Sequence, residues 1–421
     1  MTIPQIISLT IIITIVIFSL KKGSDLFSPA RVFLLVWSVS IFLAEFKFSG
    51  YQHKWSAYSW FVLLTGLLSF LLGLYISYIL NADRKLLSVS EIRNKIKANK
   101  EYDKRKLFTI ITLLFFAYII SLVLEFILRG YIPIFHPRPD RARIDFAMFG
   151  LHLFVNQMPV ILFLIVEYFI HGFKSKNKTF ILSFYFIITF FTYFLILDRF
   201  SYVYWLVMSF ALLYYMTRII NIRTTIISFS FFYIFFSFVT SIRLSKYATQ
   251  YLYVISRMKF SPEFASFTGP YMYLVMNLEN FSRGIEKLEI HTYSAMTFDW
   301  IYALFGLKHW MKDYFGYIYN PFLISNYTTY PFLWNYYLDF GLIGIFIFPL
   351  IIGIIVGLIY YNMRTKGTVA GVVAYCFCIF FVIISFFTNV LTMLSIVSNI
   401  IVLWFVHKFF ISKQISSISF N

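Results

Sequence analysis

The sequence is poor in charge and in cysteine. Charged residues make up 13% of its 421 positions, and its only cysteines are Cys376 and Cys378. Because these two lie two positions apart in an apolar run, they point to different sides of a helix and cannot form a metal-binding pair. The sequence also has no glycine-rich phosphate loop, nucleophile elbow or zinc-binding histidine motif. Its pattern therefore lacks the signatures of common soluble enzymes.

Apolar residues dominate the chain instead. Hydrophobic residues are 60% of the sequence, aromatic residues are 22%, and the mean hydropathy of +0.78 exceeds what soluble domains carry. Stretches close to the roughly 20 residues of a membrane-spanning helix recur. There are eleven, at 3–20, 30–46, 58–81, 108–128, 149–171, 180–197, 201–217, 225–241, 341–361, 369–388 and 391–407. We therefore expect an all-α polytopic membrane protein with about eleven spans, the first of which lacks the flanks of a cleavable signal peptide.

The net charge of +18 is unevenly distributed along the chain. Most basic residues lie in one set of connections, around 21–22, 84–106, 174–178, 218–223 and 364–366, and after position 407. Because lysine and arginine collect in cytoplasmic loops, we expect the chain to begin outside and end in the cytoplasm. The stretch 82–107 is interpreted as a basic cytoplasmic loop beside anionic lipid, since it lacks the interleaved aromatic residues of a nucleic-acid site. No nucleic-acid partner is expected.

Three parts make up the predicted organisation. Residues 1–241 hold the first eight spans and an outer loop at 129–148. Residues 242–340 form a large outer loop, too long for a simple connection and too aromatic for an ordinary soluble domain. We expect short amphipathic helices there, lying against the outer leaflet. Residues 341–421 carry the last three spans.

Arginines gather in the loops expected to lie outside, where positive charge is normally sparse. The stretch "HPRPDRARIDF" carries Arg138, Arg141 and Arg143, and two other turns carry Arg199 and Arg243. A planar guanidinium binds phosphate oxygens in pairs and stays charged at any pH, so this set suits the diphosphate of a lipid-linked substrate. The alternative is that these arginines bind the headgroups of ordinary phospholipids.

Several side chains are candidates for a general base or for sugar contacts. The candidate bases, which carry a group that can accept a proton near neutral pH or after a shift in pKa, are Asp140, Asp145, His136, Glu279 and His291. Tyr273, Asn277 and Asn280 share one face of a predicted helix at 269–289, which either holds sugar hydroxyls or faces water. The predicted sugar contacts are Arg138, Tyr273, Asn277, Asn280, Arg283, Asn326 and Thr328.

Other polar positions are assigned structural roles. Glu125 and Arg129 are four positions apart and are expected to pair at the membrane interface. Asp339 precedes a long apolar run and is expected to cap the helix that starts there.

Five stretches together resemble the Wzy-type oligosaccharide repeat unit polymerases, the family of bacterial O-antigen, capsule and exopolysaccharide polymerases. They are "LFSPARVFLLVW" at 26–37, "RGYIPIFHPRPDRARIDF" at 129–146, "DRFSYVYW" at 198–205, "GPYMYLVMNLENF" at 269–281 and "NYTTYPFLWNYYLDFGLIGIF" at 326–346. They occur in the family's order over nearly the whole chain, with one large outer loop late in the sequence. Order and topology, rather than any single motif, carry the resemblance.

The resemblance implies a GT-C-like glycosyltransferase fold in the bacterial cytoplasmic membrane, with its active site on the outer face. It also implies a metal-independent transfer, without a cofactor, of a growing glycan from undecaprenyl diphosphate to a new lipid-linked repeat unit. The family's diphosphate-binding arginines map onto Arg141 or Arg143, Arg199 and Arg243. A co-polymerase that sets chain length is an implied partner.

Three alternatives stay open. An O-antigen ligase would pass the finished glycan to a lipid-core acceptor. A flippase or other transporter of lipid-linked oligosaccharide would need charged residues along a route through the bilayer. A membrane acyltransferase would need a membrane-level histidine with an acidic or asparagine partner, and His152 with Asn156 is the only pair of that kind in the sequence.

Overall fold

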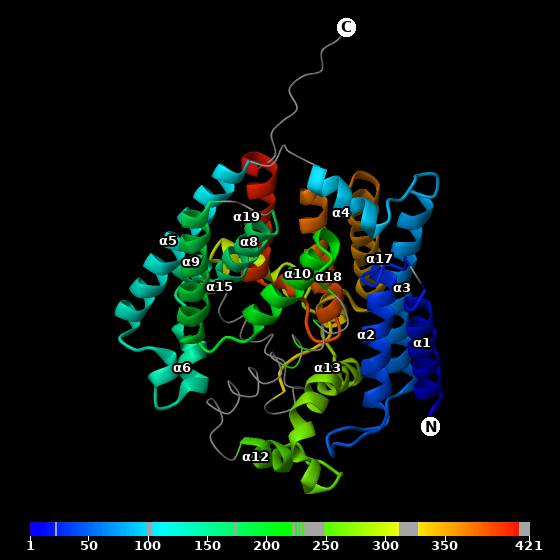
Figure 1. Ribbon diagram of the computed structural model, residues 1–421. Helices are drawn as coiled ribbons and strands as arrows, with labels where there is room; N and C mark the ends of the chain where they lie inside the picture. The colour runs from blue at the N-terminus through cyan, green and yellow to red at the C-terminus, as the bar shows by residue number, and fades with distance from the viewer. Residues whose placement is uncertain are drawn as a thin grey trace. The chain divides into compact units, whose positions relative to one another are not determined.

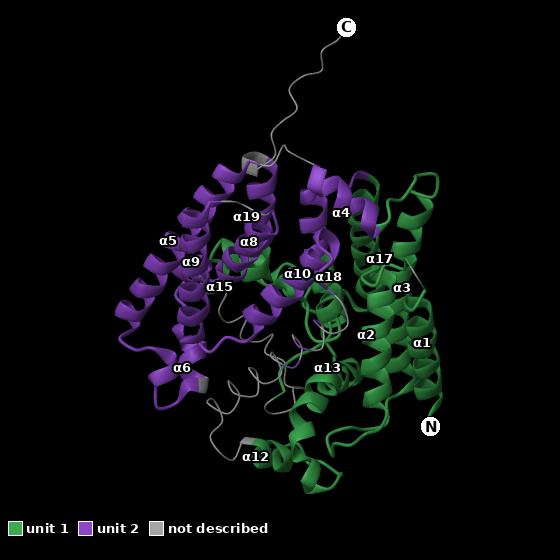
Figure 2. Cartoon of the chain, viewed as in Figure 1, with its two compact units in different colours: residues 1–88, 247–365, 378–397 green, residues 89–246, 366–377, 398–421 purple. Residues whose placement is uncertain are grey.

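The computed structural model describes residues 1–21, 23–98, 103–171, 175–220, 248–310 and 327–411, with positions 224, 227 and 230. In this part of the chain, helices are joined by turns and loops, and one β bridge pairs Ser49 with Met258. The expected all-α fold is confirmed at this level. Figure 2 shows that the chain forms two compact units. Unit 1 comprises residues 1–88, 247–365 and 378–397, and unit 2 comprises residues 89–246, 366–377 and 398–421.

Among the described residues, four helices are long and apolar enough to cross a membrane, namely Ala57–Ile79, Lys104–Phe135, Leu151–Ile170 and Leu333–Lys366. Shorter apolar helices occupy Ile3–Ser19, Pro29–Ala44, Phe200–Met216, Val369–Ile384 and Leu394–Lys408. Such helices satisfy their own backbone hydrogen bonds, which a bilayer interior requires. These findings support a membrane-embedded protein. The expected total of eleven spans stays a prediction, and the stretch 225–241 lies outside the described residues except for positions 227 and 230.

Unit 1 contains three adjoining apolar helices, several shorter helices and one long apolar helix at 333–366 (Figure 1). The apolar helices at its start are α1 (Ile3–Ser19), α2 (Pro29–Ala44) and α3 (Ala57–Ile79), followed later by α12 (Ala248–Ile255), α13 (Thr268–Lys287), α14 (Asp299–Leu304), α15 (Leu307–Trp310) and α17 (Leu333–Lys366). Helix α1 packs on α2, and α13 packs on both α2 and α3. Helices α12 to α15 lie in the described part of 242–340, and the placement of this segment outside the membrane stays a prediction. Local capping sets the starts of two helices, because Thr2 and Ser56 accept hydrogen bonds from the first-turn N–H groups of α1 and α3.

Glycines let α3 and α17 approach each other closely. A Cβ atom added to Gly73 would lie 2.2 Å from the carbonyl oxygen of Leu350, and one added to Gly353 would lie 2.2 Å from that of Phe70. One turn further on, a Cβ on Gly357 would meet the Ser77 side chain at 2.5 Å, while the Ser77 hydroxyl donates to the Ile354 carbonyl. This is small-residue packing of the kind that joins membrane helices.

Helix α17 contains a break at Gly341, whose φ of 59° and ψ of −139° are not helical. The sequence predicted that Asp339, which lies just before this break, caps the helix that follows. It does not. Asp339 is fully buried and accepts hydrogen bonds from the Thr292 hydroxyl and from the backbone N–H groups of Met296 and Thr297. The prediction of a cap was wrong because Asp339 instead binds donors of the loop 291–297, which lie 42 to 47 positions earlier in the sequence.

Unit 2 is built around α5 (Lys104–Arg129), which packs against four other elements. The elements of this unit are α4 (Val89–Ala98), α5, η1 (Pro133–Phe135), α6 (Pro139–Phe146), α7 (Leu151–Val155), α8 (Met158–Ile170), α9 (Lys176–Phe194), α10 (Phe200–Met216) and η4 (Val406–Ile411), while α18 (Val369–Ile384) and α19 (Leu394–Phe405) have residues in both units. Asp103 caps the start of α5, and Gly130, with a φ of 72°, ends it. The basic loop contains an amphipathic helix, α4, which buries Ile92 and Ile96.

The contact between α3 and α17 can be tested at Gly353. We expect Gly353→Val to destabilise the folded protein by about 1–3 kcal/mol, because its side chain would push against the backbone of α3. The measurement is thermal unfolding of the detergent-solubilised protein. Gly269→Ala is the matched control, since a Cβ there meets no atom within 4 Å. Equal melting temperatures for the two variants would contradict the close-packing argument.

Candidate functional site

Three segments of unit 2 meet at the end that carries α6 (Figure 1). The turn η1, which packs on α6, donates a hydrogen bond from Ile134 N–H to the carbonyl of Leu195 at 3.1 Å. At the end of α7, the Asn156 side chain accepts from the Tyr193 hydroxyl at 3.3 Å. The loop 129–148, the end of α7 and the segment 193–199 therefore adjoin within one unit. The two described arginine regions of the predicted diphosphate site lie at this end.

A buried carboxylate and a histidine form a pair here. Glu125 is fully buried, and its oxygens accept from His152 Nδ1 at 3.0 Å and from Met148 N–H at 3.0 Å. Its expected partner, Arg129, instead donates to the carbonyls of Phe146 and Ala147, so the predicted pair was wrong. Arg129 holds the end of α6 because those carbonyls lack helical partners. The Glu125 carboxylate therefore pairs with the imidazole of His152, which comes just after the loop 129–148.

The arginines of α6 differ in their surroundings. Arg138 and Arg141 are exposed, while Arg143 is partly buried and its Nε has no hydrogen-bond partner among the described residues. Residues two apart on a helix point in different directions, and the structure agrees for Arg141 and Arg143. A partly buried guanidinium with an unused donor has the greater capacity for a phosphate oxygen.

Arg199 is presented by a tightly held turn. Asp198 accepts from the hydroxyls of Tyr193 and Ser201 at 2.9 Å and 2.6 Å, and from Phe200 N–H at 3.0 Å. Leu197 has a φ of 63°, a left-handed conformation that leucine rarely adopts. The hydrogen bonds to Asp198 thus hold Leu197 in an unfavourable backbone conformation. Arg199 lies two residues later, at the start of α10.

A second polar cluster lies in unit 1, on the face of α13 that packs against the loop 45–56. Glu279 is almost fully buried and accepts from His53 Nδ1, from Trp55 Nε1 at 3.2 Å and from Arg283 Nε at 3.2 Å. The other ring nitrogen of His53 lies 3.2 Å from Glu286, two turns along α13. One imidazole therefore links two carboxylates, so at least one proton is shared within the cluster.

Two members of this α13 cluster were candidates from the sequence, and His53, Trp55 and Glu286 were not. Glu279 and Arg283 were predicted as a base and a sugar contact, and the structure brings them together. Arg283 also donates to the Tyr51 carbonyl, so it ties α13 to the loop. His53 was missed because it lies 226 residues from Glu279 in sequence, and no local pattern connects the two.

Two of the predicted sugar contacts are occupied by the protein itself. Asn277 and Asn280 are buried, and their amides bind the segment 327–329 through the Thr329 hydroxyl and the carbonyls of Tyr327 and Thr329. We predicted that Asn277 and Asn280 share a substrate-facing surface with Tyr273. This was wrong, because of the three only Tyr273 is exposed, at 47%. Thr328 is exposed and stays a predicted contact.

The remaining candidates are spread over the chain. His291 is partly buried, bonds to the Leu338 carbonyl and lies against Gly341. His136 bonds to the backbone of Arg138, and Asp145 is exposed on α6. Arg243 and Asn326 lie outside the described residues, as does the side chain of Asp140. Among the described residues, no group of three histidine, cysteine or acidic side chains is placed to hold a metal ion.

Another buried acid and histidine meet near the far end of α8 in unit 2. Glu167 and His407 are both buried, and the imidazole Nε2 lies 3.0 Å from the carboxylate. An ionisable pair inside apolar helices is costly and usually functional or strongly structural. The Glu167–His407 pair joins α8 to η4, although the two residues are 240 positions apart in the sequence.

A search of family models, curated proteins and solved structures finds no match for this chain. The functional argument therefore depends on the geometry of the two clusters.

A pH measurement can test the α13 cluster. Burial acts to raise the pKa of Glu286, but hydrogen bonds from Ser56 and the His53 charge outweigh it, so the pKa lies below its ordinary value of 4.5. A carboxyl group whose pKa is lowered in the folded state stabilises the fold at pH values above 4.5. This stabilisation is lost as the pH falls through the folded-state pKa. We expect Glu286→Gln to lower the melting temperature at pH 7, and the difference from the unmodified protein to shrink below about pH 4.5.

The control for this measurement is Glu289→Gln, since Glu289 is exposed just beyond the end of α13. Its melting temperature should follow that of the unmodified protein across the same pH range. A constant difference between Glu286→Gln and the unmodified protein at every pH would show that the carboxylate charge is not what stabilises the cluster.

Proposed function

We propose that this protein is a polysaccharide polymerase that joins oligosaccharide repeat units carried on polyprenyl diphosphate. The observation that carries the proposal is the Glu125–His152 pair, which adjoins the arginine-bearing loop 129–148 and the Arg199 turn within unit 2. An oriented imidazole beside guanidinium groups supplies the two functions that this transfer needs. One is a base for a sugar hydroxyl, and the other is positive charge for a diphosphate leaving group.

In this mechanism His152 accepts the proton of the acceptor hydroxyl. Its Nδ1 faces the buried carboxylate of Glu125, so the neutral ring carries its proton on that nitrogen and leaves Nε2 as the acceptor. His152 has a side chain that is 20% exposed, so one edge of the ring is within reach of a ligand. Glu125 then stabilises the imidazolium that forms. Glu125 is a positioning residue here, because it acts through the histidine.

The arginines stabilise the charge that develops on the leaving diphosphate. A bond forms between the acceptor oxygen and the anomeric carbon of the donor, while the bond from that carbon to the phosphate oxygen breaks. The electron pair leaves with polyprenyl diphosphate. We assign the stabilisation of this charge to the partly buried Arg143 and Arg199, with a contribution from the exposed Arg141, and Arg243 is the remaining predicted member of the set.

The proposal includes the finer expectations drawn from the sequence. These are a GT-C-like arrangement of eleven spans, a bacterial cytoplasmic membrane, a site facing the outside and a co-polymerase partner. An O-antigen ligase would use the same chemistry on a different acceptor. The two enzymes differ in product, since only a polymerase lengthens the glycan in repeat-unit steps.

A second candidate is a proton-coupled transporter of the same lipid-linked glycan. The observation that favours it is the buried Glu167–His407 pair, which lies with Glu125–His152 in the apolar helices of unit 2. Ionisable pairs at membrane depth commonly mark proton-linked transport. A membrane acyltransferase would also use a histidine with an acidic partner, and Glu125 supplies that partner to His152 where Asn156 does not.

Reconstitution separates these functions. We expect the purified protein in liposomes, supplied with a polyprenyl-diphosphate-linked repeat unit alone, to produce a ladder of lengthened glycans that persists with a chelator. Glycan that crosses the bilayer without lengthening would instead support the transporter. Transfer from an acyl donor, with no ladder, would support the acyltransferase.

Variants of the same preparation test the assigned roles. We expect His152→Gln and Arg199→Ala each to slow lengthening by about 100-fold or more, the usual effect of losing a general base or an electrostatic stabiliser. Arg84→Ala is the matched arginine control, because Arg84 is exposed in the basic loop. All three variants should elute as folded protein. Unchanged ladders from His152→Gln would remove the base assignment, and unchanged ladders from Arg199→Ala would remove the diphosphate assignment.

A further inference from the structure

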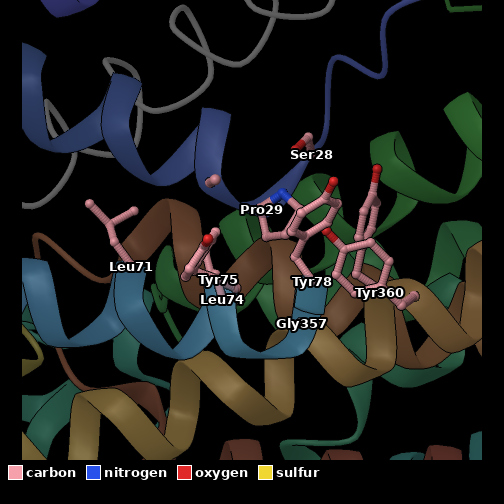
Figure 3. Close-up of a pocket in the computed structure, with 10 residues that line it drawn as sticks. Ser28, Pro29, Leu71, Leu74, Tyr75, Tyr78, Gly357 and Tyr360 are labelled. Carbon is pink, nitrogen blue, oxygen red and sulfur yellow. The ribbon is translucent and has the colours of Figure 1, made fainter. Parts of the chain in front are cut away.

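Two adjoining cavities run along one face of α3 in unit 1. The first has a volume of about 210 Å³, and Figure 3 shows it lined by side chains that include Leu71, Leu74, Tyr75, Tyr78 and Tyr360. The second has a volume of about 560 Å³ and is lined by Thr65, Leu68, Ser69, Leu71, Leu72, Tyr75 and Phe346. Because Leu71 and Tyr75 line both, the two form one groove, which we call the α3 groove. It follows α3 from Thr65 to Tyr78.

The α3 groove has an apolar body and a polar end. The polar end carries the hydroxyls of Ser28, Tyr75, Tyr78 and Tyr361, none of which makes a hydrogen bond with another described residue. Beside them, the Tyr360 hydroxyl donates to Asp25, whose carboxylate also pairs with Arg364 at 2.9 Å. Unused hydroxyls next to an ion pair form a surface for a polar headgroup, and tyrosines at such a level are typical of a membrane interface.

We infer that the α3 groove binds one diacyl phospholipid, with an acyl chain along α3 and the headgroup at the Ser28 and Arg364 end. The fourteen residues from Thr65 to Tyr78 span about 20 Å, at a rise of about 1.5 Å per residue. One leaflet of a bilayer has a hydrocarbon depth of about 15 Å, so the groove accommodates a single acyl chain together with its glycerol linkage. Ester and phosphate oxygens accept hydrogen bonds from the four hydroxyls.

The geometry favours a phospholipid over the polyprenyl carrier of the proposed reaction. The basic loop 82–107 begins directly after α3, and Leu87 N–H donates to the Arg364 carbonyl at 2.7 Å. The polar end of the α3 groove is thus next to the segment predicted to be cytoplasmic. The diphosphate of a substrate used on the outer face lies in the opposite leaflet. The inference does not depend on the proposed function.

The test is native mass spectrometry of the full-length protein released from detergent, with extraction and identification of the bound lipid. We expect about one phospholipid to remain on the unmodified protein. Leu71→Trp fills the shared wall of the two cavities and should lower this occupancy at least tenfold. Leu64→Trp is the matched control, because Leu64 is 48% exposed on the same helix and lines neither cavity.

A double variant, Tyr75→Phe with Tyr78→Phe, keeps the rings and removes only hydroxyls, so it tests the polar end even if the tryptophan variant folds poorly. It should also lower phospholipid occupancy. The inference is overturned if the unmodified protein carries no phospholipid, if a polyprenyl phosphate is the lipid retained, or if Leu64→Trp and Leu71→Trp lose lipid equally. Retention by the double variant at the level of the unmodified protein would overturn the headgroup placement.

Discussion

The charge of a buried carboxylate must be matched inside the protein, and this requirement organises the described part of the chain. Ionised groups are strongly disfavoured away from water unless they are paired and hydrogen-bonded. The described residues include five buried acidic side chains, which are Asp25, Glu125, Glu167, Glu279 and Asp339. Each accepts hydrogen bonds from another segment of its own unit. Removing any of these carboxylates would leave buried donors without partners, and so disturb the loops that meet there.

The same requirement prepares groups for chemistry. Three of the five carboxylates face a histidine, and a carboxylate partner fixes which ring nitrogen carries the proton. At Glu125 the histidine is partly exposed and lies beside the loop 129–148, which carries four arginines. At Glu167 the histidine is buried, so that pair is closed to a ligand of any size. At Glu279 the histidine meets a second carboxylate. One kind of interaction thus produces three different sites, which differ in exposure and in the nearest charges.

Sequence patterns predicted the helices better than they predicted the contacts. Apolar length alone places α3, α5 and α17. The Glu125 partner was wrong because spacing on one helix was considered and the hairpin was not. The segment between α5 and α7 contains η1 and α6, and it folds back so that His152 at the start of α7 meets Glu125 near the end of α5. The exposed face expected for Asn277 and Asn280 was wrong because the face of a helix that turns toward protein depends on which neighbour covers it. No sequence pattern near α13 predicts that the segment 327–329 packs against Asn277 and Asn280.

The sequence by itself determined that this chain is helical and suited to a membrane, because hydrophobicity and backbone hydrogen bonding act over a single turn or a single span. It also determined where arginine is concentrated, which is a matter of composition. Only the tertiary structure decided the partners of the buried acids. Glu279 meets His53 across 226 positions, and Glu167 meets His407 across 240. Packing sets such distant contacts, through glycine approaches such as Gly73 with Leu350 and through loops whose length leaves many pairings open.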